Sequence, residues 1–191
     1  MSESAAVTKQ KSKIYSISMC AVAAAAICVL APLSIPIGPV PITLATLVIY
    51  VMLYLLGWKL SVVSCAVYLL LGVCGLPVFS GFSGGAGKLL GPTGGYLIGY
   101  LLIAAIGGAA VERFQSRMPQ FLGMALGTAA CYLLGTAWFC FVSQMEVVPA
   151  LSLAVFPFIP FDIAKMAAAM LIGPVIRERL IRAGLIRGAS D

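Results

Sequence analysis

The sequence predicts an all-α membrane protein built from six transmembrane helices. Of its 191 residues, 62% are hydrophobic and only 9% are charged, and six long apolar stretches recur along the chain. An ordinary soluble domain carries about 25% charged residues, so this chain cannot cover a surface that faces water. Lipid must therefore be its main solvent, and the lipid bilayer is the first partner we expect.

A helix needs about 20 apolar residues to cross the hydrocarbon core of a bilayer. Six stretches meet or approach this length, although the third is short. We expect a cytoplasmic tail over residues 1–13, one six-helix domain over 14–183 and a cytoplasmic tail over 184–191. The six stretches run roughly over Ile14–Leu33, Val40–Leu56, Leu60–Cys74, Thr93–Val111, Gln120–Val142 and Asp162–Leu180.

The positions of lysine and arginine predict the orientation of the chain. Cytoplasmic loops of membrane proteins carry an excess of these residues. Ten of the 12 basic residues fall on one side if the six helices alternate in direction. That side should be the cytoplasm, with both chain ends inside a bacterial cytoplasmic membrane. The ten are Lys9, Lys11, Lys13, Lys59, Arg113, Arg117, Arg177, Arg179, Arg182 and Arg187.

The glycine-rich stretch from Gly75 to Tyr96 invites comparison with a phosphate-binding loop. Such a loop needs Gly-Lys followed by Ser or Thr, with another glycine five positions before the Gly-Lys glycine. Here Leu89 follows Lys88, and Phe82 stands where the first glycine belongs. The stretch would also face outward, away from cytoplasmic nucleotides. We therefore expect no ATP site in this loop.

Other kinds of site are excluded by residue type. The chain has no histidine, which removes histidine-based triads, proton relays and metal ligands. The six cysteines lie in or beside apolar runs without Cys-x-x-Cys spacing, so we expect them to pack as small apolar side chains. We expect no cofactor, no metal, no enzymatic activity and no nucleic-acid partner.

Two basic residues depart from the orientation rule. Lys88 lies in the outer glycine loop, and Lys165 lies near the outer end of the sixth stretch, three residues after Asp162. Positions three apart share a helix face, and charges at membrane depth are functional suspects. The alternative is that Asp162 and Lys165 only neutralise each other or that Lys165 snorkels to the interface. Asp162 is also a candidate N-terminal cap of its helix.

The loops expected on the outer side are rich in proline or glycine but almost free of charge. Irregular backbone at membrane depth is tolerated where protein buries it or where it lines a cavity. We therefore expect these loops to fold over the outer mouth of the bundle and to cover a small apolar pocket. Lys88, Asp162 and Lys165 would supply its polar contacts. Aromatic side chains such as Phe79 and Tyr96 would cover the apolar body of a small organic anion.

Four stretches carry a resemblance to a known family. They are SIPIGPVPITL, YLLLGVCGLPVFSG, LLGPTGGYLIGY and PFDIAK. The chain resembles BioY, the biotin-specific substrate-binding (S) component of energy-coupling-factor (ECF) transporters. The resemblance covers nearly the whole chain. It implies the six-helix S-component fold, with biotin held near the outer surface under capping loops.

The resemblance also implies a set of substrate-binding residues. Asp162 and Lys165 match an Asp and a Lys that contact the vitamin in the family, the Asp by accepting a ureido N–H. The chain departs from many members at Ala45, where they carry Gln, and at Ser83, where they carry Arg. Lys88 is our candidate for the biotin carboxylate in place of that arginine. The full set is Asp162, Lys165, Lys88, Tyr96, Ser83, Gly84 and Phe79.

S components act with partners, and the resemblance implies a transmembrane T component and two ATP-binding subunits. Small residues let helices approach closely in lipid. Ala21 and Ala25 lie four apart in the first stretch and are candidates for docking the T component, or else for packing within the monomer. A solitary biotin carrier, an S component for another small anionic vitamin, an intramembrane enzyme and a purely structural subunit are the alternatives.

Overall fold

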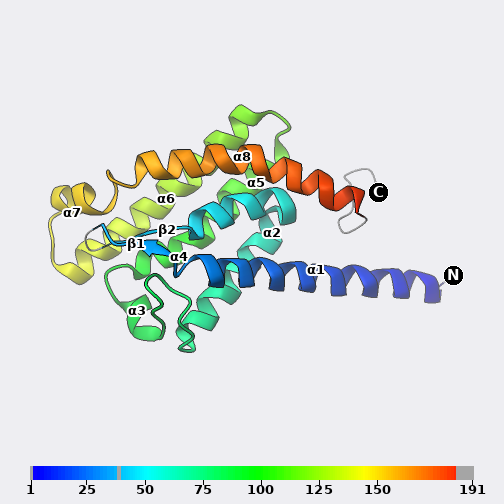
Figure 1. Ribbon diagram of the computed structural model, residues 1–191, viewed down its shortest axis with the longest axis horizontal. Helices are drawn as coiled ribbons and strands as arrows, with labels where there is room; N and C mark the ends of the chain where they lie inside the picture. The colour runs from blue at the N-terminus through cyan, green and yellow to red at the C-terminus, as the bar shows by residue number, and fades with distance from the viewer. Residues whose placement is uncertain (1, 38–39, 184–191) are drawn as a thin grey trace.

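The computed structural model describes residues 2–37 and 40–183, with the side chains of residues 2–13 left out. The chain is mostly helical, with one short hairpin (Figure 1). In chain order the elements are α1 (Ser2–Leu30), β1 (Ser34–Ile35), β2 (Ile42–Thr43), α2 (Ala45–Val73), α3 (Ala86–Leu90), α4 (Gly94–Leu102), the π-helix η1 (Ile103–Gly107), α5 (Gly108–Arg113), α6 (Arg117–Ser143), α7 (Val147–Ala154) and α8 (Ile159–Arg182).

Among the described residues, four helical stretches are long and apolar enough to cross a membrane, and α1 contributes a shorter apolar helix over Ile14–Leu30. The all-helical membrane character is therefore confirmed, while six separate spans remain a prediction. The four stretches are Ala45–Val73, Gly94–Arg113, Arg117–Ser143 and Ile159–Arg182.

The second and third predicted spans lie within the single element α2, which bends sharply at Gly57. The backbone of Gly57 has φ 72° and ψ 179°, a combination open essentially only to glycine. The two arms leave the bend in different directions, so a glycine takes the place of the expected loop (Figure 1). The arm over 45–56 is only about 18 Å long at 1.5 Å per residue, too short to cross a bilayer alone.

Close helix packing fixes the centre of the bundle. Gly99 of α4 lies against Cys131 of α6, and Gly135 of α6 lies against the ring of Tyr96, so that a Cβ atom at either glycine would clash. Small residues at such contacts let transmembrane helices approach closely. The buried core spreads from this contact over the facing sides of α2, α4, η1 and α6.

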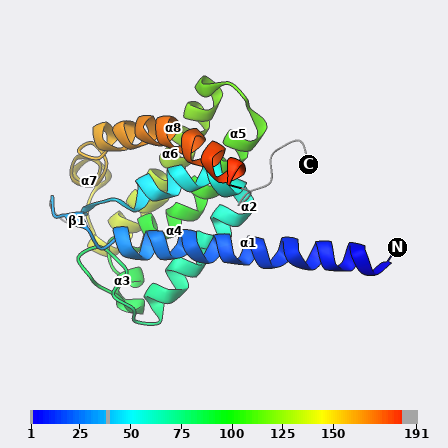
Figure 2. The ribbon, with the colours of Figure 1, turned by 45° about the vertical axis from the view of Figure 1, so that its right-hand side comes forward.

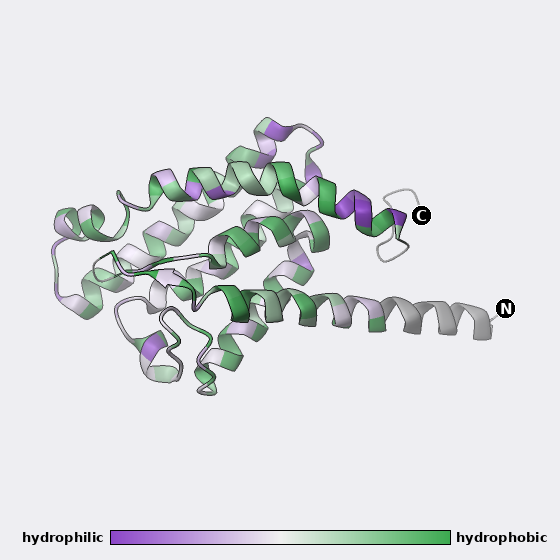
Figure 3. Ribbon diagram, viewed as in Figure 1, coloured by the Kyte–Doolittle hydropathy of each residue, from purple (hydrophilic) through white to green (hydrophobic). Residues whose placement is uncertain are grey.

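The elements divide between two ends of the molecule. In Figures 1 and 2, the start of α1, the bend of α2, the loop between α5 and α6 and the last turns of α8 lie toward the right. The β1–β2 hairpin, α3 and α7 lie toward the left in both views. Hydrophilic residues gather in the last turns of α8 and at the α5–α6 loop (Figure 3). This division agrees with the predicted clustering of basic residues at one end.

The three predicted outer loops carry short elements of their own. The first forms an antiparallel hairpin that pairs Ser34 with Thr43 and Ile35 with Ile42. The second contains α3 and an isolated bridge between Phe79 and Ser83, and the third contains α7. These segments are structured, and each buries part of its apolar side chains, as Ile42, Phe79 and Ala154 show.

Two predicted boundaries differ from the structure. Helix α8 begins at Ile159 with Phe158 as its cap residue, so the prediction of Asp162 as N-terminal cap is wrong. Pro160 occupies the first turn, where a missing N–H costs nothing. Helix α1 already begins at Ser2, within the predicted tail of residues 1–13. Arg187 and the predicted tail over 184–191 lie outside the described residues.

We predict that Gly57→Ala destabilises the protein by about 2 kcal/mol, because an alanine cannot hold the backbone angles of the bend without strain. The midpoint of thermal unfolding in detergent should fall by roughly 5 °C. Gly87→Ala is the matched control, since Gly87 has no positive φ and open space around its Cβ position. Equal midpoints for the two variants would show that the bend does not need glycine.

Candidate functional site

A buried carboxylate, Asp162, is the centre of the polar contacts between three helices. Asp162 lies in the first turn of α8, and only 5% of the residue is exposed. Thr46 of α2 donates its hydroxyl to Oδ1 at 3.2 Å, and Tyr132 of α6 donates its hydroxyl to Oδ2 at 2.5 Å. Both carboxylate oxygens therefore have a hydroxyl partner from a neighbouring helix.

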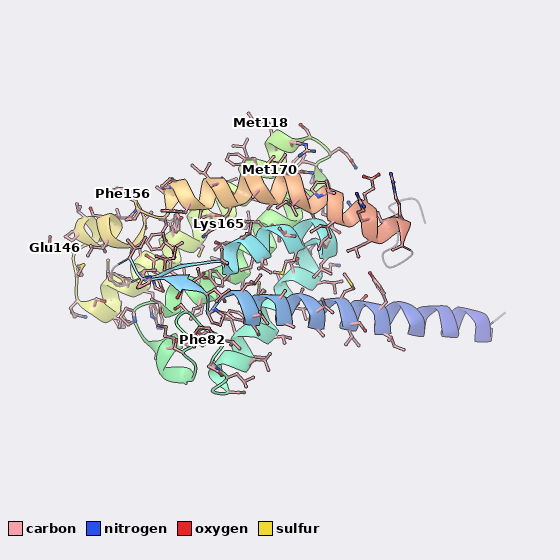
Figure 4. The ribbon with its side chains drawn as sticks, viewed as in Figure 1. Phe82, Met118, Glu146, Phe156, Lys165 and Met170 are labelled. Carbon is pink, nitrogen blue, oxygen red and sulfur yellow. The ribbon has the colours of Figure 1, made fainter. Side chains whose placement is uncertain are left out.

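Lys165 neutralises this carboxylate. Its Nζ lies 3.0 Å from Asp162 Oδ1, and it also donates to the Thr46 hydroxyl at 2.9 Å. The two side chains are 13% and 7% exposed, so the ion pair is largely removed from solvent. Figure 4 shows Lys165 on the side of α8 that faces the first arm of α2. The helical spacing of three residues places both charges on one face, as predicted.

A partly open cavity of about 50 Å³ lies beside this ion pair. Its walls come from α2, α4, η1, α6 and α8 and from two outer segments: the β1–β2 hairpin region and the stretch around α7. The lining is mostly apolar and aromatic with a few hydroxyls, the usual composition of a small-molecule site. The lining residues are Val40, Pro41, Thr43, Thr46, Tyr96, Tyr100, Ile103, Thr128, Cys131, Tyr132, Ala154, Phe158, Asp162 and Lys165.

A second cavity of about 30 Å³ adjoins the first and shares five of its lining residues, Val40, Pro41, Thr43, Tyr96 and Tyr100. It is also lined by Ser80, between α2 and α3, and by Thr93, the cap residue of α4. An open apolar groove of about 480 Å³ is lined by the β1–β2 hairpin, by the residues that flank it and by Gly81 and Phe82. Thr43 of the hairpin is common to the lining of this groove and of the two inner cavities.

Two hydroxyl pairs hold lining residues of the cavity in place, one through Thr128 and the other through Tyr96. The Tyr50 and Thr128 hydroxyls lie 2.7 Å apart, and those of Tyr96 and Thr136 lie 3.0 Å apart. Each pair joins two helices, because Tyr50 belongs to α2, Tyr96 to α4 and both threonines to α6. The cavity walls are therefore tied together by hydrogen bonds as well as by apolar packing. Ile103, where the π-helix η1 begins, supplies an apolar part of the same wall.

The structure brings together three of the seven predicted substrate-binding residues. Asp162, Lys165 and Tyr96 line the same cavity. The remaining four belong to the second outer segment and are absent from the lining of the two inner cavities. They are Phe79, Ser83, Gly84 and Lys88.

These four residues shape the second outer segment itself. Phe79 is fully buried and meets the ring of Tyr68 edge-on at 5.5 Å. Ser83 donates its hydroxyl to the Ser80 carbonyl at 2.8 Å, closing a tight turn. Gly84 lies so close to the Leu76 carbonyl that a Cβ atom would clash. Lys88 is half-buried on α3. The predicted substrate contacts of all four residues stay predictions.

Sequence reasoning missed the hydroxyl partners of the charged pair. Thr46 and Tyr132 are separated from Asp162 by 116 and 30 positions along the chain. Nothing in their local sequence distinguishes them from other Thr and Tyr residues in apolar helices. Tyr100 is different, because it lies four residues after the predicted Tyr96, and that helical spacing would have predicted the same face.

The arrangement suits recognition of a polar, uncharged group more than chemistry. Asp162 can accept N–H bonds and Lys165 can donate to an oxygen, once they exchange the hydroxyls that they now contact. The described residues hold no cluster of three His, Cys, Asp or Glu side chains that could bind a metal ion. The apolar remainder of the lining would cover a non-polar body.

We predict that Asp162→Asn and Lys165→Met each lower the free energy of unfolding by about 2–3 kcal/mol, because each leaves a buried charge unpaired. The double variant should lose less than the sum of the two by about 1 kcal/mol or more. Denaturant titrations in detergent without added ligand measure all four proteins. Additive losses would mean that the pair is not coupled.

Comparisons with known proteins agree with this geometry. The BioY family profile matches residues 4–182. A biotin transporter BioY of Thermotoga maritima is 40% identical over 140 residues, which cover 73% of this chain and 82% of that protein. A probable biotin transporter BioY of Pyrococcus horikoshii is 38% identical over 161 residues, 84% of this chain and 94% of that protein.

One solved structure is also similar. It is the S-component for biotin from an ECF-type ABC transporter, with a TM-score of 0.81 and 31% identity, and the match covers 88% of this chain and 93% of that one. Fold, sequence and helix composition thus agree on a multi-pass membrane protein. The chain belongs to the BioY family.

Proposed function

We propose that this protein takes up biotin across the cytoplasmic membrane as the S component of an ECF-type transporter. One observation carries the proposal: a buried Asp–Lys pair lines an apolar, hydroxyl-bearing cavity beneath outer segments, in a chain of the BioY family. The identity of the ligand is inferred from the relatives named as biotin transporters and from the biotin S-component of similar fold.

The chemistry of biotin matches the cavity lining. The ureido group offers N–H donors and a carbonyl oxygen, which suit the Asp162 carboxylate and the Lys165 ammonium. In this structure the hydroxyls of Thr46 and Tyr132 make hydrogen bonds to the two charged groups. A bound ligand would replace these hydrogen bonds with its own. Tyr96, Tyr100 and Phe158 lie around the cavity and would cover the apolar part of the ring system. Because the lost bonds are replaced, the exchange costs little.

Biotin entry requires the lining to move. A cavity of about 50 Å³ has space for only a few water molecules. The β1–β2 hairpin contributes lining residues to both inner cavities and to the groove, so we propose that its displacement merges them. Thr43 faces all three spaces, and its hydroxyl lies 3.5 Å from that of Tyr100. We propose this weak contact as the one that opens.

The membrane arrangement follows from counting the two arms of α2 separately. With α1, the α4–η1–α5 stretch, α6 and α8, they make six segments that run between the two ends of the molecule, although the first arm is too short to cross a bilayer alone. The two chain ends then lie on the same side, which the excess of arginine and lysine assigns to the cytoplasm. The β1–β2 hairpin, α3 and α7 would face outward.

The transport step needs the T component and two ATP-binding subunits, since the family's S components bind substrate without an ATPase of their own. Ala21 and Ala25 are both exposed on the face of α1 that points away from the core residues Ala24 and Ile27. A free face of small residues lets another transmembrane helix approach closely. This face is our candidate for T-component docking.

Biotin titration of the purified protein in detergent tests the assignment. Wild-type protein should bind biotin saturably, and Asp162→Asn and Lys165→Ala should each weaken binding by roughly a hundredfold, since both remove a charge-assisted hydrogen bond in a dry site. Lys59→Ala, at the bend of α2, removes the same charge far from the cavity and should bind normally. Absence of saturable binding by the wild type would sink the proposal.

The same titration tests Lys88 when biotin is compared with biotin amide, which lacks the carboxylate. If Lys88 pairs with that carboxylate, Lys88→Ala should weaken biotin binding roughly tenfold and leave the amide almost unaffected. Equal losses for both ligands would deny Lys88 this role.

Docking has its own measurement. We expect Ala21→Trp with Ala25→Trp to abolish co-purification with the T component and ATP-binding subunits, because the large rings hold a second helix away. Biotin binding by the isolated protein should persist. Leu133→Trp, at an exposed position of α6, is the control for ring bulk alone. Unchanged co-purification of the double variant would move the docking face elsewhere.

A further inference from the structure

Helix α8 contains a proline, Pro174, in its interior. Proline has no backbone N–H, so the carbonyl four residues earlier loses its normal helical partner. That carbonyl belongs to Met170, which is half-buried on the same helix. The bond made at this carbonyl lies at an exposed position, so either water or a side chain can satisfy it.

The partner is a cation from another helix. Arg117 donates from Nη1 to the Met170 carbonyl oxygen at 2.6 Å. Met118, next to Arg117, and Met170 are labelled in Figure 4 where the start of α6 meets the middle of α8. A charged donor makes a stronger hydrogen bond than a neutral one, and Arg117 supplies it where α8 lacks its own.

Arg117 is poorly placed for its own helix. It is the first residue of α6, where the helix dipole is positive and a cation is unfavourable. The first turn of α6 contains no acidic residue that would offset this charge. The stability of α6 therefore does not explain Arg117, whereas the clustering of basic residues at this end and the bond to α8 both do.

This bond is one of two that join α6 and α8. Within residues 40–183, the side-chain hydrogen bonds between these helices are Tyr132 to Asp162 and Arg117 to Met170. Helix α8 packs mainly on α2 and only lightly on α6. Polar contacts thus set the position of α8 relative to α6, one at the cavity and one at the proline.

The surroundings of the second bond are themselves fixed. Gly173 packs directly on the ring of Tyr54 from α2. The Tyr54 hydroxyl donates to Gln120 Oε1 at 3.3 Å, and Gln120 Nε2 donates to the Phe114 carbonyl at 2.7 Å. The start of α6 is therefore anchored to α2 and to the preceding loop, so Arg117 holds α8 against a fixed support.

We propose that Arg117 is a positioning residue for the ligand site: by bonding the carbonyl that Pro174 leaves unpaired, it holds α8 so that Asp162 and Lys165 stay opposite Tyr132. The ligand part of this inference rests on the proposed biotin function. The bond between Arg117 and α8 does not.

A double-mutant cycle with Pro174→Ala separates this role from a general loss of charge. Alanine restores the N–H that bonds the Met170 carbonyl within the helix, so Arg117 is no longer needed there. In the wild-type background, Arg117→Met should speed biotin dissociation roughly fivefold and lower the unfolding midpoint by about 4 °C. In the Pro174→Ala background both effects should largely disappear.

Two further variants complete the design. Arg113→Met removes the same charge from the same end of the molecule without a cross-helix bond among the described residues, and it should leave both readouts unchanged. Arg117→Lys keeps a cationic donor and should restore at least part of the slow dissociation. Circular dichroism and gel filtration establish that each variant is folded before it is measured.

The outcomes are distinguishable. If wild-type protein does not bind biotin, the proposed function fails, while the unfolding cycle still tests the bond. Equal losses with and without Pro174 overturn the inference, as does an Arg117→Met effect no larger than that of Arg113→Met. A coupled unfolding cycle with unchanged biotin dissociation makes the bond a structural tie only and overturns the positioning role.

Discussion

The burial of one ion pair at membrane depth constrains the rest of this structure. A charge in a low-dielectric interior is costly unless it is paired and fully hydrogen-bonded. Asp162 and Lys165 meet that condition only where α2 supplies Thr46 and α6 supplies Tyr132. The three helices must therefore meet at one place. The close glycine contacts between α4 and α6 then fix the fourth wall.

The same contacts explain how the pair can serve a ligand. A carboxylate held by three donors and an ammonium held by two acceptors are satisfied, so the folded state does not depend on an occupant. A ligand that offers N–H groups and an oxygen replaces hydroxyl contacts with equivalent ones. The site then selects against molecules that cannot replace these hydrogen bonds, because binding them would leave a buried charge unpaired.

The sequence predicted the membrane fold, the clustering of basic residues, the family and the Asp–Lys pair. The family resemblance depends on four sequence stretches, and the other three depend on composition, on the positions of basic residues along the chain or on spacing within one helix. It did not predict the hydroxyl partners of that pair, because contacts between distant segments leave no mark on local periodicity. The bend at Gly57 was taken for a loop, since Gly57 and Lys59 interrupt the apolar run and only the backbone angles show a bend within one helical element. The charge of Lys88 made it a candidate, yet Lys88 does not line the inner cavities. Its place depends on the path of the chain between α2 and α4, which the sequence does not reveal.

The π-helix η1 has a consequence for how the site varies among related sequences. A π-helical turn contains one more residue than an α-helical turn, so it rotates every later side chain about the helix axis. Ile103 faces the cavity at one end of η1, and Gly108 packs against Trp58 just beyond its other end. A single-residue deletion inside 103–107 would keep either the cavity wall or the contact with the α2 bend, but not both. Relatives that lack this turn must compensate in α5 or in the bend, and length changes in the two segments should therefore occur together.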